Sequence, residues 1–225
     1  MTLPSLINDK QNKELQTQFK KVYSELNQAS IQFYSAEGIS IPEYARTNGP
    51  LTSLNKFLSY FKGATKVSNH TWNSTNPDGE RTKPPYKLMP FKGSSEATQM
   101  CDISGYWIET GGRTFLINDA PASDNQNGPV LCVDINGSKL PNRYGKDNFL
   151  FIFTTDGLVI PMGMEHKNNI SSGGSVAPNF NMEGNQYCRS TTSEYQQLSC
   201  AYYALADIHP QKEEKSYWKD FINEK

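Results

Sequence analysis

The sequence has few of the residues and motifs on which catalysis most often depends. It has only three histidines, and no Gly-x-Ser-x-Gly, His-Glu-x-x-His or Walker A motif occurs. Its four cysteines form no Cys-x-x-Cys pair, which argues against a zinc site or a thioredoxin-like redox motif. The histidines, His70, His166 and His209, each fall in a predicted loop or at the end of an element. We therefore expect no enzymatic activity and predict no catalytic residue.

The chain also lacks an excess of charge of either sign and a long hydrophobic run. It has 22 basic and 23 acidic residues, so binding of nucleic acid has no bulk electrostatic support and is not expected. No run of about 18 apolar residues and no signal peptide occurs. A composition rich in Asn, Ser, Thr, Gly and Tyr is nevertheless common in exported proteins. We therefore expect an exported protein in which Met1 replaces a longer natural N-terminus.

Glycine and a second proline are absent between Pro4 and Tyr34, and this stretch reads as one long helix. Its apolar residues recur at alternating steps of four and three, which places them on one face of an α-helix. This packing stripe consists of Leu15, Phe19, Val22, Leu26, Ala29 and Phe33. A helix of about 45 Å must lie against something. We expect the rest of the chain to pack on the stripe.

The segment after this helix is expected to contain one short helix and a long loop. The long helix should end between Ser35 and Gly38, with Gly38 as its C-cap. Residues 39–48 are predicted to be a connector, and Asn48 to cap a second helix that ends at Gly63. Residues 64–98 and 163–187 are predicted to be surface loops. Four apolar residues should anchor the first of these loops: Trp72, Tyr86, Leu88 and Phe91.

From residue 101 the apolar pattern changes to the period of two that is typical of β-strands. Strands at 106–109 and 113–117 flank Gly111-Gly112 and predict a hairpin. Further strands are predicted at 130–135, 149–153 and 158–161. Residues 200–208 fit either a strand or a short helix, and residues 217–222 fit a helical turn. The sequence thus predicts one α+β domain over 1–225. Its parts are a helical stem (1–35), a short helix with a loop (36–100), and an antiparallel sheet with a C-terminal loop region (101–225).

The four cysteines are compatible with two disulfides in an exported protein. Three connectivities exist. We favour Cys188–Cys200, because this pair closes a short polar loop, which leaves Cys101–Cys132. Four buried free thiols in a cytosolic protein are the alternative.

The loop between two predicted strands, 134–147, is rich in oxygen-bearing side chains. Asp134, Asn136 and Asp147 are the candidate ligands of a calcium ion, which takes six to eight oxygens. Ser138 and Asn142 also fall at alternate positions of this loop, but it lacks the glycine and the glutamate of an EF-hand. Asx side chains also cap turns through their own backbone, and this alternative stays open. No other cofactor is expected.

The same segment resembles type IV pilin-like proteins of bacteria and the related pseudopilins of type II secretion systems. The resemblance rests on Val133-Asp134-Ile135-Asn136-Gly137, Pro141-Asn142, Gly145-Lys146-Asp147-Asn148-Phe149, Asp156-Gly157 and Pro161. Residues 2–7, followed by the amphipathic helix, are similar to the stem of those proteins. Residues 57–61 are similar to a short helix that follows this stem. Cys188 and Cys200 are similar to a C-terminal cysteine pair.

The resemblance implies a subunit of a type IV pilus or a type II secretion-like filament. Its partners would be other pilin subunits, contacted through the N-terminal helix, in a periplasmic or extracellular filament. The precursor would be anchored in the inner membrane by a hydrophobic helix that is absent from this chain, so no processing-site residue can be carried over. We expect the stripe to be buried under the sheet and the 3–11 end of the helix to project. Major pilin, minor pilin and pseudopilin remain open.

A freestanding exported binding module, such as an adhesin or a carbohydrate binder, is the second hypothesis. Exposed aromatic residues can stack on sugars, and they can equally anchor a core or a loop. The candidate residues are Trp72, Tyr86, Trp107, Tyr202 and Tyr203.

Overall fold

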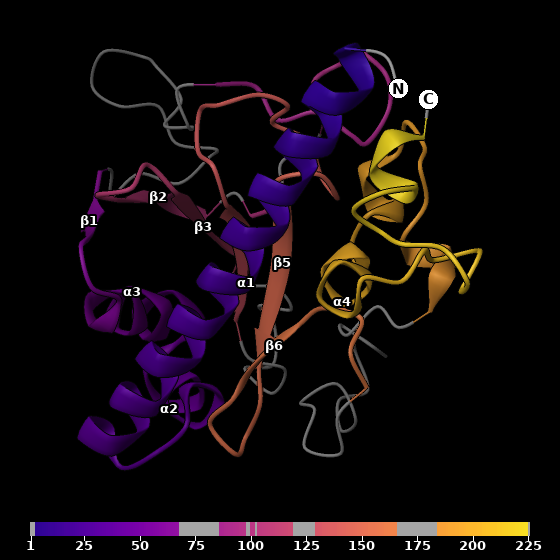
Figure 1. The fold of residues 1–225 in the computed structure, drawn as a ribbon. Helices are drawn as coiled ribbons and strands as arrows, with labels where there is room; N and C mark the ends of the chain where they lie inside the picture. The colour runs from indigo at the N-terminus through magenta and orange to yellow at the C-terminus, as the bar shows by residue number, and fades with distance from the viewer. Residues whose placement is uncertain are drawn as a thin grey trace.

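The computed structural model describes residues 3–67, 86–97, 100–101, 103–118, 129–165 and 184–224. One long helix lies diagonally across a six-stranded antiparallel sheet (Figure 1), which is the α+β arrangement predicted from the sequence. The helices are α1 (Leu3–Glu37), α2 (Ile41–Asn48), α3 (Pro50–Tyr60) and α4 (Cys200–Ala206). The strands are β1 (Ala64–Lys66), β2 (Ile103–Glu109), β3 (Thr114–Asn118), β4 (Val130–Asp134), β5 (Asn148–Phe153) and β6 (Val159–Pro161).

The packing stripe of α1 is buried against the sheet, as its spacing predicts. All six stripe residues belong to the main hydrophobic core, and Phe19, Val22, Leu26 and Phe33 have no exposed surface. The ring centroid of Phe19 lies 4.7 Å from that of Phe149 on β5 and 5.9 Å from that of Trp218. No described helix is long and apolar enough to cross a membrane. The stripe is the apolar face through which α1 packs against the sheet.

The C-terminus of α1 is a glycine cap, as predicted. The helix ends at Glu37, and Gly38 adopts φ 74°, where its amide donates to the carbonyl oxygen of Tyr34 at 2.9 Å. A left-handed residue of this kind satisfies a carbonyl at the helix end, and glycine adopts it without steric cost. The chain then turns back along α1 and begins the next helix within three residues.

The prediction of a connector over 39–48 is wrong, because these residues contain the helix α2. A capping box starts α2: the backbone amide of Glu43 donates to Oγ of Ser40 at 3.4 Å, and the Ser40 amide donates to Oε2 of Glu43 at 2.9 Å. The prediction that Asn48 caps the next helix is also wrong. Gly49 is the N-cap of α3, whereas the Asn48 side chain donates to the carbonyl of Tyr44. The capping box before α2 and the glycine N-cap before α3 thus mark the starts of two helices in a segment without a long apolar repeat.

Replacing Ser40 by alanine should lower the free energy of unfolding by about 1 kcal/mol. The substitution removes the side-chain acceptor for the Glu43 amide and the bond from Oγ of Ser40 to Oε2 of Glu43, which is 2.7 Å long. Urea denaturation of the purified protein would measure the change. Ser24→Ala, at an exposed position of α1, is the matched control and should change stability by less than about 0.5 kcal/mol. Equal effects of the two substitutions would contradict the capping role.

The sheet is a meander in which each strand pairs with the next strand in the sequence. The hairpin predicted around Gly111-Gly112 joins β2 and β3, with Phe115 opposite Trp107. Leu131 and Val133 on β4 pack in the core beneath α1, whereas Val130 and Cys132 belong to a second core on the other face. Because both faces are covered, β4 and β5 are buried along their whole length.

The structure describes the C-terminal elements and parts of both predicted loops. Residues 200–208, which fit a strand or a helix, form α4, and the predicted C-terminal turn contains the 3₁₀ helix Phe221–Asn223. The loop prediction for 64–98 is wrong at its start, where β1 pairs with β2. Leu88 and Phe91 are buried anchors and Tyr86 is half-buried, whereas Trp72 lies outside the described residues. In the second predicted loop, 163–187, residues Asn185–Tyr187 form a 3₁₀ turn and 166–183 lie outside the described residues.

Both disulfides have the connectivity favoured from the sequence. Cys101–Cys132 links the segment before β2 to the middle of β4, over a separation of 31 residues. Cys188–Cys200 links the start of α4 to the polar segment before it, over 12 residues. Disulfides persist in oxidising compartments, so this pairing supports an exported protein.

Candidate functional site

The connection between β4 and β5 contains several buried polar side chains, and Asp147 organises it. The two carboxylate oxygens of Asp147 accept hydrogen bonds from the backbone amides of Asn142, at 2.7 Å, and Arg143, at 2.6 Å. The carbonyl of Asp147 accepts from the amide of Ile135 at 2.9 Å. Part of this loop is thus an Asx-capped turn, which was the structural alternative to a metal site.

Gly137 fixes the position of this connection against the rest of the sheet. It adopts φ 64°, and a Cβ atom at this position would lie 1.9 Å from the carbonyl oxygen of Gly112. Gly112 lies in the turn of the β2–β3 hairpin, so two loops touch backbone to backbone. Only glycine allows this approach. The loop is therefore supported by the hairpin as well as by its own strands.

Two carboxyl groups of the connection are buried without exposure to solvent. Burial raises the pKa of Asp134 well above its ordinary value, and the charge of Asp147 raises it further. Burial likewise raises the pKa of Asp147, to about 7, against hydrogen bonds from the amides of Arg143 and Asn142. Neither carboxylate forms an ion pair with a described residue. In the absence of an ion-pair partner, burial and the neighbouring carboxylate thus favour the neutral form of Asp134.

Several buried polar atoms beside these carboxyl groups have no hydrogen-bond partner among the described residues. They are Oδ1 of Asn136 and both side-chain polar atoms of Asn148. The Tyr86 hydroxyl and the Asp134 carboxyl group interact with each other through a side-chain hydrogen bond that affects both pKa values. Asn148 lies directly opposite Asp134 in the β4–β5 register, so the two side chains project from the same face of the sheet. The charge of Asp134 is also felt by Tyr86, whose pKa is raised by burial first and by this carboxylate second.

The structure brings together the three ligand candidates predicted from the sequence and adds one. Asn136 reaches both carboxyl groups: its backbone amide donates to Oδ1 of Asp134 at 3.3 Å, and its side chain lowers the pKa of Asp147 through a hydrogen bond. Ser138 is exposed. The side-chain amide nitrogen of Asn142 faces the carbonyls of Gly137 and Lys139 and donates to both. We call Asp134, Asn136, Asp147 and Asn148 the β4–β5 cluster. Strand register was the signal that could have identified Asn148.

A cleft runs from Asn136 toward the C-terminus and the first turns of α1. It is lined by this connection, by Phe91 to Gly93 and by residues 222–224. Two of its basic side chains contact the segment around Phe91: Arg143 donates to the carbonyls of Pro90 and Gly93, and Nζ of Lys146 lies 4.4 Å from the ring centroid of Phe91. Burial and the neighbouring Arg143 lower the pKa of Lys146 to about 8. Leu140 at the rim is 80% exposed.

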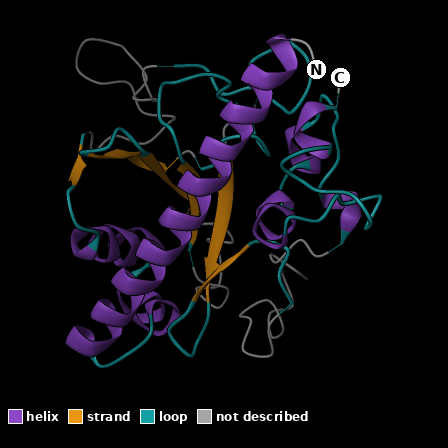
Figure 2. Cartoon of the chain, in the orientation of Figure 1, coloured by secondary structure: helices purple, strands orange, loops and turns teal. Residues whose placement is uncertain are grey.

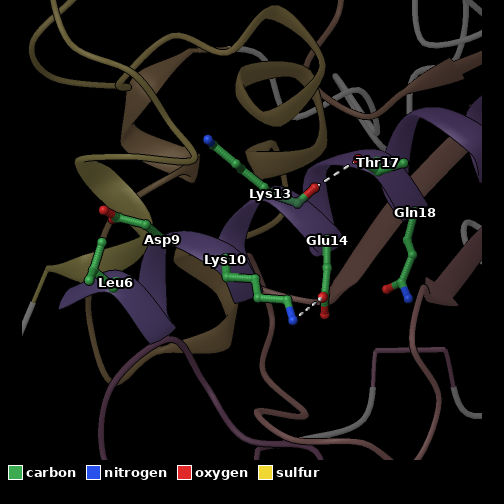
Figure 3. A pocket seen from close by; sticks show the side chains of 7 residues that line it. All are labelled: Leu6, Asp9, Lys10, Lys13, Glu14, Thr17 and Gln18. Atoms are coloured by element: carbon green, nitrogen blue, oxygen red, sulfur yellow. Dashed lines mark hydrogen bonds and ion pairs between the residues drawn. The ribbon is translucent and has the colours of Figure 1, made fainter. Parts of the chain in front are cut away.

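A second hollow runs along α1, and the side chains that line it do not converge on one point. Figure 3 shows its lining side chains spread along one stretch of the helix, from Leu6 to Gln18. Lys10 and Glu14 form an exposed ion pair of 4.0 Å, and Oγ1 of Thr17 donates to the carbonyl of Lys13 at 2.8 Å. These are ordinary contacts of a solvated helix face.

No protein-family model, curated protein or solved structure matches this chain. What the chain does must therefore be inferred from its own geometry and from the motifs that it carries.

The remaining sequence candidates are held by structural contacts where the structure describes them. His209 is buried, its Nδ1 accepts from the amide of Gln211, and its Nε2 lies 3.0 Å from Oε1 of Glu224. His70 and His166 lie outside the described residues. Among the described residues, no three side chains of His, Cys, Asp or Glu gather at one point. The β4–β5 cluster combines two carboxylates with amide oxygens instead.

The expectation that Trp107 is exposed for stacking on sugars is wrong. Only 9% of its surface is exposed, and its Nε1 donates to Oδ1 of Asn55 on α3 at 3.0 Å. Tyr202 and Tyr203 are half-buried and contact each other edge to face. Trp107 is therefore a core residue, which removes one member of the proposed aromatic binding surface.

Proposed function

We propose that this chain is the globular part of a filament subunit of the type IV pilus or type II secretion class. The observation that carries the proposal is the two-part exposure of α1. From Leu15 to Phe33 the stripe of the helix is buried under the sheet, whereas every side chain from Leu6 to Gln11 is exposed. Figure 2 shows this end of α1 extending past the sheet. A helix that is packed at one end and open at the other suits assembly through that open end.

The open end also offers apolar surface. Leu6 is 48% exposed and Ile7 is 49% exposed, on consecutive positions of the first described turn. Asn12 is the first buried side chain after them, and its Nδ2 donates to Oδ1 of Asn223 at 3.2 Å. In the proposal, a hydrophobic helix precedes α1 in the precursor, anchors it in the inner membrane, and later packs against the helices of neighbouring subunits. The two disulfides support assembly in the periplasm or outside the cell.

The test is incorporation of the chain into filaments by the source bacterium. Filaments sheared from the cells should react with an antibody raised against residues 1–225. Replacing both Leu6 and Ile7 by lysine should reduce incorporation at least tenfold, because charges would occupy the apolar contact between helices. The purified variant should keep the melting temperature of the unmodified chain, since neither side chain is in its core.

A matched control places the same charges elsewhere on α1. Ser24 and Gln28 are exposed positions of α1 beside the buried part of the helix. Lysine at both should leave incorporation within about twofold of the unmodified chain. The proposal fails if the chain is absent from sheared filaments and is found as a free protein whose precursor has a cleaved signal peptide. That result would favour a freestanding exported module.

A further inference from the structure

We propose that the β4–β5 cluster binds a calcium ion. The inference goes beyond the filament function and does not depend on it. The ion would be held by carboxylate oxygens of Asp134 and Asp147 and by amide oxygens of Asn136 and Asn148.

The first argument is charge. Asp134 and Asp147 are both 0% exposed. Of the basic groups nearby, Arg143 donates to backbone carbonyls, and Lys146 lies over Phe91, where its charge acts on Asp147 without forming an ion pair. Lys139 is exposed. Transferring a carboxylate out of water is costly unless a counter-charge or a set of donors compensates it. A divalent cation would neutralise the two carboxylates together.

The second argument is the set of unpartnered oxygens, which is independent of charge. Turn capping accounts for Asp147, whose two oxygens each accept a backbone amide. It does not account for Oδ1 of Asn136 or for Oδ1 of Asn148, which are buried and have no partner among the described residues. More than nine in ten buried polar groups are paired in folded proteins. The unpaired side chain of Asn148 lies opposite the buried carboxyl group of Asp134 on one face of the sheet, and this arrangement points to a ligand between them.

The donor set selects the kind of cation. All candidate ligands are oxygens, and all four cysteines of the chain are in disulfides. Hard cations prefer such ligands, whereas zinc and copper prefer nitrogen and sulfur. Magnesium retains several waters, which a cluster with three fully buried side chains has little room to admit. Calcium sheds its water more readily and accepts irregular geometry. Asn136, which lines the cleft, provides the side from which the ion enters.

The experiment uses the purified chain with its disulfides intact, first stripped of metal with EGTA. Calcium at about a hundred times its dissociation constant should raise the melting temperature by roughly 5–10 °C. Calorimetric titration should give one site per chain. Terbium, a luminescent substitute for calcium, should bind in competition with calcium and emit when the neighbouring tyrosines are excited. Millimolar magnesium should leave the melting temperature within about 1 °C.

The decisive variant is Asp134→Asn, which keeps the shape of the side chain and removes its charge. It should lose the calcium response and the terbium emission, yet its EGTA-treated form should melt at or above the temperature of the unmodified chain, because one buried charge is gone. Loss of the response through misfolding would instead lower that baseline. Asp9→Asn, on the exposed end of α1, should respond to calcium like the unmodified chain. The inference fails if calcium does not change the melting temperature of the unmodified chain, or if Asp134→Asn responds equally.

Discussion

Replacing Phe19 by alanine should lower the free energy of unfolding by about 3–5 kcal/mol, the typical cost of removing a buried phenylalanine. Phe19 has no exposed surface and lies where α1, β5 and the C-terminal segment meet. Its ring centroid is 4.7 Å from that of Phe149 and 5.8 Å from that of Phe151. The cavity would open between rigid elements that cannot readily collapse into it. Urea denaturation followed by tryptophan fluorescence would report the loss, because Trp218 is one of the rings that contact Phe19.

A matched substitution on the same helix separates packing from helix propensity. Ile31 is 61% exposed on α1, and Ile31→Ala should change the free energy of unfolding by less than about 0.5 kcal/mol. For a chain of this length, Phe19→Ala should lower the melting temperature by roughly 6–20 °C, and Ile31→Ala by less than about 2 °C. A small effect of Phe19→Ala would show that α1 is not held by its buried stripe.

Removal of either disulfide should have the second largest effect, and the longer loop should matter more. By loop-closure entropy, the 31-residue separation of Cys101–Cys132 contributes about 4 kcal/mol and the 12-residue separation of Cys188–Cys200 about 3 kcal/mol. Replacing each pair by alanine and comparing urea denaturation of the two variants would measure both values. All four cysteines are fully buried, so the loss of volume on substitution is similar for the two pairs.

Reduction of the unmodified chain provides the control that changes no side-chain volume. A phosphine reductant present throughout denaturation should lower the free energy of unfolding by at least the larger of the two single-pair effects. If stability is the same with and without reductant, the two bonds do not restrict the unfolded chain. If removing Cys188–Cys200 costs more than removing Cys101–Cys132, strain or local contacts outweigh loop length.

The long helix and the central hairpin could be predicted from the sequence, because each is defined by a pattern that extends over many residues. Six apolar positions define the stripe from Leu15 to Phe33, and the hairpin around Gly111-Gly112 has alternating strands on both sides. The helix α2 was missed because eight residues are too few for a periodic signal. Its start could have been found from Ser40 and Glu43, which have the spacing of a capping box. The strand β1 is three residues long and depends on pairing with residues 107–109, so no local pattern reveals it.

The candidate site was predictable in its residues but not in its environment. The spacing of Asp134, Asn136 and Asp147 suggests oxygen ligands, and the structure brings these side chains together. Burial of both carboxyl groups could not be predicted, because it depends on a second core that covers the other face of the sheet. Asn148 could have been found by placing β5 opposite β4, which sets it against Asp134. Tyr86 comes from a segment 48 residues before Asp134 and has no local signal.

The position of the packing stripe at the start of the chain determines when its core can close during synthesis. Phe19 leaves the ribosome early, whereas its partners on β5 and in the C-terminal segment, Phe149 and Trp218, are made last. At 5–20 residues per second, roughly 10–40 s separate Phe19 from Trp218. Until β5 and β6 have been made, the apolar face of α1 has no complete sheet to cover it. Until then this face is open to other apolar surfaces, and it is fully enclosed only when Trp218 has been made.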